Sequence, residues 1–179
     1  MDRIICILTS LLMINLISSS EMDARPKAVS SIWSLSGIGI GYEHQLDAGS
    51  FIQIDFKAEM AELFKERSWK PGGTASFTWN MQIGSLISNY GSKVSLFAGP
   101  GAVIGWTDDH KAPSGLLFGL KGRLGIECLF KRNIAVSASI APSLAMHLSV
   151  NQDMEYNMRT FRNGLIYGFI PEIGIKYCF

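Results

Sequence analysis

The chain has 179 residues, of which 47% are hydrophobic and 17% charged, and glycine occurs 18 times. Its 16 basic and 15 acidic side chains nearly cancel, so the composition predicts neither a nucleic-acid partner nor an anionic substrate. The length suits one domain with a sizeable core or one small closed barrel. There is no Cys-x-x-Cys pair and no metal-ligand spacing, so we expect no cofactor and no metal site.

Residues 1–20 are predicted to be a secretory signal peptide. Arg3 precedes an apolar run from Ile4 to Ile17, which is shorter than the about 20 residues that a membrane-spanning helix needs. Small residues then suit a cleavage site after Ser20, with Ala24 as the second choice, and a retained anchor is the alternative. The rest divides into an N-terminal segment, 21–30, which is a candidate for part of a first strand, and a β-barrel, 31–179.

From about residue 31 onward, apolar side chains recur at every second position, which is the period of a β-strand. In the stretch "TASFTWNMQIGSLI", for example, Phe77, Trp79 and Met81 alternate with polar residues. Turn residues divide the pattern into seven predicted strands, near 31–45, 50–58, 74–87, 93–106, 115–130, 134–149 and 161–179. The connections between them alternate between short turns, such as "LDAG" and "KRN", and longer polar loops, such as "VNQDMEYNMRT".

Two folds are compatible with this alternation. In a soluble sandwich or lipocalin-like barrel the apolar face would be the core, whereas in an outer-membrane barrel it would meet lipid. The predicted strands are much longer than the roughly 5–6 residues of soluble strands. The signal peptide, the alternating loop lengths and the polar face rich in glycine, alanine and serine also favour the membrane fold. We therefore predict an all-β protein, an antiparallel up-and-down transmembrane β-barrel of eight strands in the outer membrane.

The count of seven strands conflicts with this fold, because a barrel with both termini on the periplasmic side has an even number of strands. Three explanations are open: a short, irregular first strand before residue 31, a misinterpreted stretch 31–45, or a wrongly assigned start of the chain.

The segment "IPEIGIKYCF" at residues 170–179 is predicted to be the closing strand of the barrel. Its apolar face carries Ile173, Ile175, Tyr177 and Phe179, and the two aromatic residues suit the girdle at the periplasmic interface. An aromatic terminal residue after such alternation resembles the signal that outer-membrane assembly machinery recognises.

Several motifs resemble a family of small outer-membrane β-barrel proteins of Gram-negative bacteria, with the eight-stranded architecture of OmpA- and OmpX-type barrels. The motifs are "GYEHQL", "FTWNM", "FAGPGAVIGW", "GLKGRLGIE", "SIAPSL" and "RNGLIYGFIPEIGIKYCF". The resemblance covers residues 38–179. It implies outer-membrane lipids, lipopolysaccharide and the barrel assembly machinery as partners, and it names no extracellular ligand.

Eight charged residues fall on the predicted inner face, four acidic and four basic: Glu43, Asp55, Lys57, Lys121, Arg123, Glu127, Glu172 and Lys176. Isolated charges in a narrow interior are costly, so we expect ion pairs that fill the lumen. For Lys121 and Arg123 the expected partners are Glu127 or Glu172. The predicted function is therefore a structural or surface-interaction protein with a plugged interior, and a narrow porin-like channel is the alternative.

A third function, a lipid A-modifying enzyme, rests on His147 and Ser149. A His-x-Ser pair near the outer end of a penultimate strand is similar to lipid A 3-O-deacylase barrels, in which a Glu, here Glu155, would complete the triad. The alternation points both residues into the barrel and away from lipid, so we predict no enzymatic activity.

Three further signals have simple interpretations. The "GPGAVIG" stretch lacks the Lys and the helix of a phosphate loop. The run Asp108-Asp109-His110 is expected to be a solvated loop. Cys128 and Cys178 fall on opposite faces and are not expected to form a disulfide.

Overall fold

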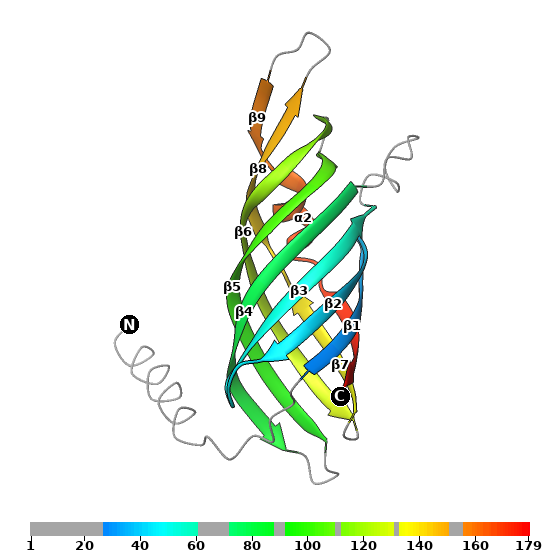
Figure 1. Ribbon diagram of the computed structural model, residues 1–179, viewed down its shortest axis with the longest axis vertical. Helices are drawn as coiled ribbons and strands as arrows, with labels where there is room; N and C mark the ends of the chain where they lie inside the picture. Colours follow the sequence, from blue (N-terminus) through cyan, green and yellow to red (C-terminus); the bar gives the residue numbers. More distant parts are fainter. Residues whose placement is uncertain (1–26, 61–71, 88–91, 110–111, 131–132, 151–155) are drawn as a thin grey trace, which may run out of the picture.

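The computed structural model of the protein describes residues 27–60, 72–87, 92–109, 112–130, 133–150 and 156–179 (Figure 1). The predicted signal peptide, 1–20, falls outside the described residues, as do residues 61–71 between two of the predicted strands. Ten strand segments and one short helix make up the described chain. Their bounds are β1 Lys27–Ser34, β2 Gly37–Gln45, β3 Ser50–Glu59, β4 Gly72–Ile87, β5 Lys93–Asp109, β6 Ala112–Phe130, β7 Ile134–Ile140, β8 Ser143–Val150, β9 Tyr156–Thr160, α2 Arg162–Gly168 and β10 Glu172–Cys178.

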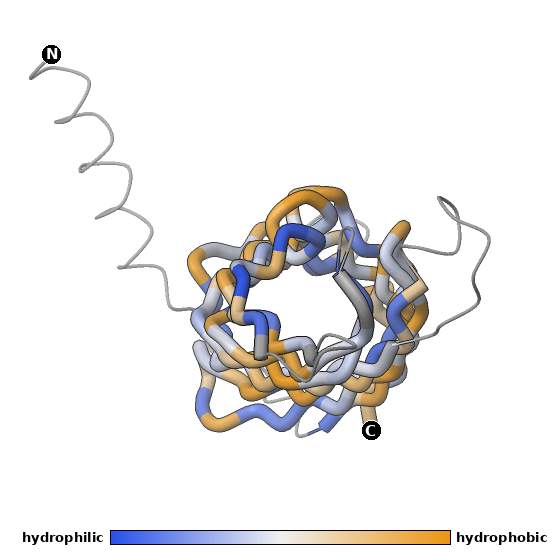
Figure 2. The backbone as a smooth tube through the Cα atoms, turned by 90° about the horizontal axis from the view of Figure 1, so that it is seen from above, coloured by the Kyte–Doolittle hydropathy of each residue, from blue (hydrophilic) through white to orange (hydrophobic). Residues whose placement is uncertain are grey.

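These segments form a closed antiparallel barrel of eight strands, as predicted. Neighbours in the chain pair from β1 to β6, and β10 closes the ring by pairing with β1 on one side and β7 on the other. Two barrel strands are interrupted: β7 and β8 both pair with β6 and form one strand, while β9, α2 and β10 follow the path of another. Seen from above, the backbone traces a ring (Figure 2).

The seven-strand count was wrong because residues 31–45 are not one strand. The chain turns at Leu35 and Ser36, so that β1 and β2 form a hairpin with Trp33 opposite Ile38. The Ser34 side chain accepts a hydrogen bond from the Gly37 N–H and donates one to its carbonyl. The first strand therefore begins at Lys27, inside the 21–30 segment, and the total becomes even.

The predicted strand 161–179 was also wrong over its first half. Residues 162–168 are helical, and only Glu172–Cys178 is a strand. The preceding predicted loop contains β9. The predicted strand 134–149 is broken at Ala141-Pro142, where Pro142 has no backbone N–H for the ladder.

The alternation places apolar side chains on the outside of the barrel. Leu120 is 68% exposed, and large apolar side chains of every barrel strand are exposed in the same way. The inner face is polar: Gln53, Thr78, Asn80 and His147 have no exposed surface. In water this would be an inverted protein, whereas in a bilayer the outer face is the one that lipid solvates. Among the described residues, no helix is long and apolar enough to cross a membrane.

Candidate functional site: the barrel interior

All eight charged residues predicted for the inner face lie in the barrel interior, where they form three groups. In the lower group, at the end of the barrel where β1 begins and β10 ends, the Lys176 ammonium lies 2.8 Å from Glu127 and also contacts the carboxylate of Glu43. In the middle group, Asp55 lies 3.2 Å from Arg123 and 3.9 Å from Lys121.

The upper group is a single pair. Lys57 lies 2.7 Å from Glu172, and its ammonium also donates a hydrogen bond to Ser36. The prediction that Glu127 or Glu172 lies beside Lys121 and Arg123 was therefore wrong, because the carboxylate beside them is that of Asp55. Glu127 and Glu172 pair with the two other lysines.

Neutral polar side chains complete these groups. The Gln53 amide donates to Asp55 at 2.6 Å, the Arg123 guanidinium donates to Ser139 at 3.3 Å, and Lys121 donates to Ser76 at 2.9 Å. Glycine makes room for the carboxylate, because a Cβ atom at Gly41 would lie 2.5 Å from an Asp55 oxygen. Buried charges need such partners to compensate for lost hydration.

Two aromatic rings lie among the charges. Phe51 and Phe97 pack edge to face with centroids 5.6 Å apart, and the Lys176 ammonium lies 5.6 and 5.4 Å from their respective centroids. The Arg123 guanidinium lies 5.8 Å from the Phe97 centroid. All three distances are within the range of cation–π attraction. Gly125 permits this packing, because a Cβ atom there would lie 2.5 Å from the Phe97 ring.

A layer of buried side chains divides the lumen into a lower and an upper cavity. Along β3 the inward residues are Phe51 at the lower cavity, Gln53, and Asp55 at the upper cavity. Along β10 they are Cys178 at the lower cavity, Lys176 and Gly174, and Glu172 at the upper cavity. We refer to the layer between the cavities as the septum; it consists of Gln53, Phe97, Arg123 and Lys176.

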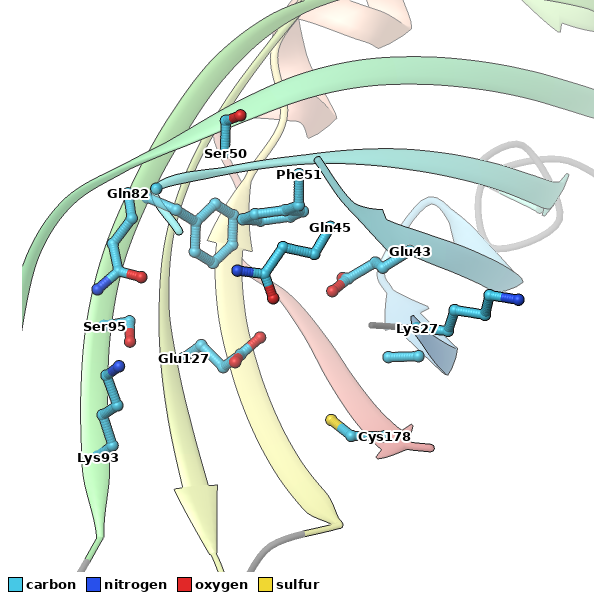
Figure 3. A pocket seen from close by; sticks show the side chains of 13 residues that line it. Lys27, Glu43, Gln45, Ser50, Phe51, Gln82, Lys93, Ser95, Glu127 and Cys178 are labelled. Carbon is cyan, nitrogen blue, oxygen red and sulfur yellow. The ribbon is translucent and has the colours of Figure 1, made fainter. Parts of the chain in front are cut away.

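The lower cavity has a volume of about 60 Å³ and the upper about 50 Å³. Figure 3 shows the lower one, with Glu43 and Glu127 directed into it beside the Phe51 ring. A water needs about 10–15 Å³ measured in this way, so each cavity has room for only a few waters. Every septum side chain is at most 4% exposed.

His147 and Ser149, the candidates for lipid chemistry, are buried on the inner face, and Glu155 lies outside the described residues. The His147 Nε2 atom is 2.8 Å from the Thr107 carbonyl oxygen, and the ring stacks on Phe161 with centroids 6.3 Å apart. Neither side chain faces lipid, so this pair is not placed as a lipid-cleaving site would be.

The solvated loop predicted for Asp109 was wrong. The residue is only 4% exposed and lies at the end of β5. Its carboxylate accepts hydrogen bonds from the backbone N–H groups of Arg162 and Asn163, at 3.2 and 3.1 Å. It therefore caps α2. His110 lies outside the described residues. Within the described part of the chain, no group of three or more His, Cys, Asp or Glu side chains is arranged to hold a metal ion.

The predicted terminal residues lie on the outer face of the closing strand. Ile173, Ile175, Tyr177 and Phe179 are all more than half exposed, and the rings of Tyr177 and Phe179 stack with centroids 6.5 Å apart. The Phe179 N–H donates to the Lys27 carbonyl at 3.0 Å, a bond that joins the last strand of the barrel to the first. Neither of the two cysteines in the described residues forms a disulfide; Cys178 lies at the lower cavity and Cys128 is half-buried on β6.

The fold and interior define a closed, eight-stranded β-barrel of the outer-membrane type. Among solved structures, the chain is similar to the N-terminal β-barrel domain of OprF from Pseudomonas aeruginosa, with a TM-score of 0.50 and 9% sequence identity. The match covers 86% of this chain and 96% of that domain. At this identity the likeness shows the fold. No protein-family model and no curated protein sequence matches the chain.

Proposed function

We propose that this protein is a small integral barrel of the bacterial outer membrane whose interior is closed, and that it has a structural or surface-interaction role. It belongs, in this proposal, with small barrels of the OmpA and OmpX type. Its partners are outer-membrane lipids, lipopolysaccharide and the barrel assembly machinery. The apolar outer face supports the location, because only a lipid environment solvates so many exposed apolar side chains.

The septum is the observation that carries the closed interior. Phe97 and Lys176 are each 1% exposed and fill the centre of the lumen, and cations on two strands lie against the aromatic rings. An eight-stranded barrel is only wide enough for side chains to fill its interior. An ion-selective path would be lined by an excess of one charge, whereas the three groups contain four acids and four bases.

The experiment that tests the proposal compares folding with conductance. The mature protein should fractionate with the outer membrane and show heat-modifiable migration in electrophoresis, as a folded barrel does. In planar bilayers it should give no steady conductance. A reproducible ohmic channel whose ion selectivity reverses in Arg123→Glu would establish the porin-like alternative instead.

A further inference from the structure

One section of the barrel wall is not a strand. On the β1 side, pairing with β10 ends at Trp33 opposite Ile173, and the chain then turns into β2. Above that level α2 stands where the closing strand would continue (Figure 1). Among the described residues, the backbone hydrogen bonds between segment 161–168 and its neighbours in the barrel wall all go to the side of β7 and β8. The Ala141 N–H donates to the Gly168 carbonyl and the Phe161 N–H donates to the Ala145 carbonyl, both at 2.8 Å.

The sequence of α2, "RNGLIYG", is a poor helix former. Its internal glycine, Gly164, disfavours a helix by about 1 kcal/mol relative to alanine. Phe161 at the start offers no side-chain cap, and that role falls to Asp109 of β5. The helix therefore depends on contacts with other elements.

Gly164 and Gly168 allow α2 to lie directly against the break between β7 and β8. A Cβ atom on Gly164 would collide with the Ser143 hydroxyl, and one on Gly168 would collide with the Pro142 backbone. At the start of the helix, the Phe161 ring fills a buried apolar cluster with Val103, Leu117 and Ala145. Asp109 and Phe161 thus hold one end of α2, and Gly168 holds the other.

The two faces of α2 meet different surroundings. Leu165 and Ile166 are exposed on the outer, lipid-facing side, as is Phe169 just after the helix. Asn163, Gly164, Tyr167 and Gly168 line the upper cavity. At this point, a single short helix separates the cavity from the outer surface of the barrel.

The upper cavity is amphipathic. Ile32, Val103, Leu117 and Phe161 give it an apolar wall, while its charged side chains include the Lys57–Glu172 pair and Lys121 with Asp55. Glu59 lines the cavity as well, so three acids face two lysines there, and the excess negative charge disfavours an anionic head group. A head group without charge also avoids the desolvation cost that a buried cation would pay. At about 50 Å³ the cavity has no space for an apolar chain while Phe161 is in place.

We propose that α2 is a lateral gate through which a single-chain amphiphile without net charge passes from the bilayer into the upper cavity, its chain replacing the Phe161 ring against Val103 and Leu117. A helix can leave the wall at lower cost than a strand, because part of its backbone bonds within the segment, and only its two ends lose the partners that Asp109, Ala145 and Ala141 now supply. The proposal rests on the membrane location proposed above.

The test uses a thiol in the cavity and a neutral maleimide with a dodecyl chain as the amphiphile. In a Cys128→Ser, Cys178→Ser background, Ser76→Cys places the thiol on β4 at the upper cavity. Ser143→Cys with Gly164→Cys supplies a disulfide that locks α2: a Cβ atom on Gly164 would collide with the Ser143 hydroxyl, so the two cysteines meet once α2 shifts slightly to admit them. The folded barrel is reconstituted in liposomes, and labelling of residue 76 is measured by mass spectrometry.

We expect the oxidised lock to slow dodecyl-maleimide labelling by about tenfold or more, because labelling follows the population of the open segment. Reductant should restore the rate, and Asp109→Ala without the lock should raise it, because alanine offers no acceptor to the first N–H groups of α2. The matched control, Ser95→Cys at the lower cavity, should label at the same rate with and without the lock. A single Ser143→Cys should show no effect of oxidation.

Equal labelling of residue 76 with and without the lock would overturn the gate. Faster labelling by a sulfonated, water-soluble maleimide, insensitive to the lock, would also overturn it, because access would then be through the rim. If the locked protein does not fold, Asp109→Ala decides alone: no acceleration in a folded barrel refutes the gate. A heat-modifiable, non-conducting barrel with no gate would leave the proposed function standing.

Discussion

The Lys176 ammonium lies 2.8 Å from the Glu127 carboxylate while it also contacts Glu43, so one buried cation serves two buried anions. The middle group has the opposite arrangement, with two cations around Asp55. The three groups are therefore balanced in total but not locally: the lower group has one excess negative charge and the middle group one excess positive charge. Opposite net charges attract, which favours contact between the lower and middle groups.

Lys176→Met should destabilise the barrel strongly, because it leaves Glu43 and Glu127 facing each other without a cation. Removing one partner of a buried ion pair costs roughly 3–5 kcal/mol. Urea unfolding in detergent micelles, followed by the heat-modifiable shift, measures the loss. Combining Lys176→Met with Glu43→Gln and Glu127→Gln should recover most of the stability, whereas Lys27→Gln at the exposed rim should change little. A triple variant as unstable as Lys176→Met would show that packing, not charge, is lost.

Phe97→Ala should connect the two cavities, because the ring is the largest fully buried side chain of the septum. The variant is expected to conduct small ions in planar bilayers where the unmodified barrel does not. It should also lose about 3–5 kcal/mol of stability, typical of a large-to-small change at a buried Phe. Phe97→Leu is the matched control and should remain closed. If Phe97→Ala stays silent while folded, the charged side chains alone close the lumen.

The sequence predicted the barrel because its period-two alternation persists through most strands. Because successive side chains of a strand point to opposite faces, the alternation alone predicts that Leu120 points outward and Arg123 inward. The pairing of the charges could not be predicted in the same way. Whether Asp55 or Glu127 pairs with Arg123 depends on the register between strands that are far apart in the chain. The alternation shows which face a side chain is on but does not give that register.

The first hairpin and α2 were missed for different reasons. Leu35-Ser36 is a turn so short that the alternation continues across it almost unbroken, and no Pro or Asn marks it. The segment "TFRNGLIYGF" was absorbed into the last strand although it does not alternate well. Its two glycines four residues apart and the following Pro171 were the available signal. Asp109 could not be found locally, because its partners are more than fifty positions away.

Leu120→Arg should destabilise the protein by about 2–4 kcal/mol if the residue lies near the bilayer midplane. The side chain is 68% exposed on the outer face of β6, so the substituted guanidinium would enter hydrocarbon. Leu120→Phe is the matched control: it keeps the side chain apolar and should cost much less stability than the arginine. Unfolding in liposomes gives the magnitude. A cysteine at Leu120 or Trp79 should also resist water-soluble, membrane-impermeant thiol reagents, and rapid reaction at either site would reverse the face assignment.

Phe179→Ser should impair assembly of the barrel more than its final stability. The ring is 55% exposed and contacts Tyr177 on the outer face, so its loss removes little packing from the folded barrel. The backbone bond from the Phe179 N–H to the Lys27 carbonyl can persist in the variant. If the terminal ring is a recognition signal, however, the unfolded chain should accumulate in the periplasm. Cell fractionation measures this, and refolding of the purified variant in detergent serves as the control.

The same experiment includes a matched change on the opposite face of the strand. Cys178→Ser alters an inward side chain one position away, at the lower cavity, and leaves the outer aromatic pair intact. It should reach the outer membrane at the normal level. Tyr177→Ser should give a smaller defect than Phe179→Ser, because the terminal ring is retained. Phe179→Ser protein that accumulates normally in the outer membrane, with a normal heat-modifiable shift, would show that the terminal ring acts only as part of the interfacial girdle.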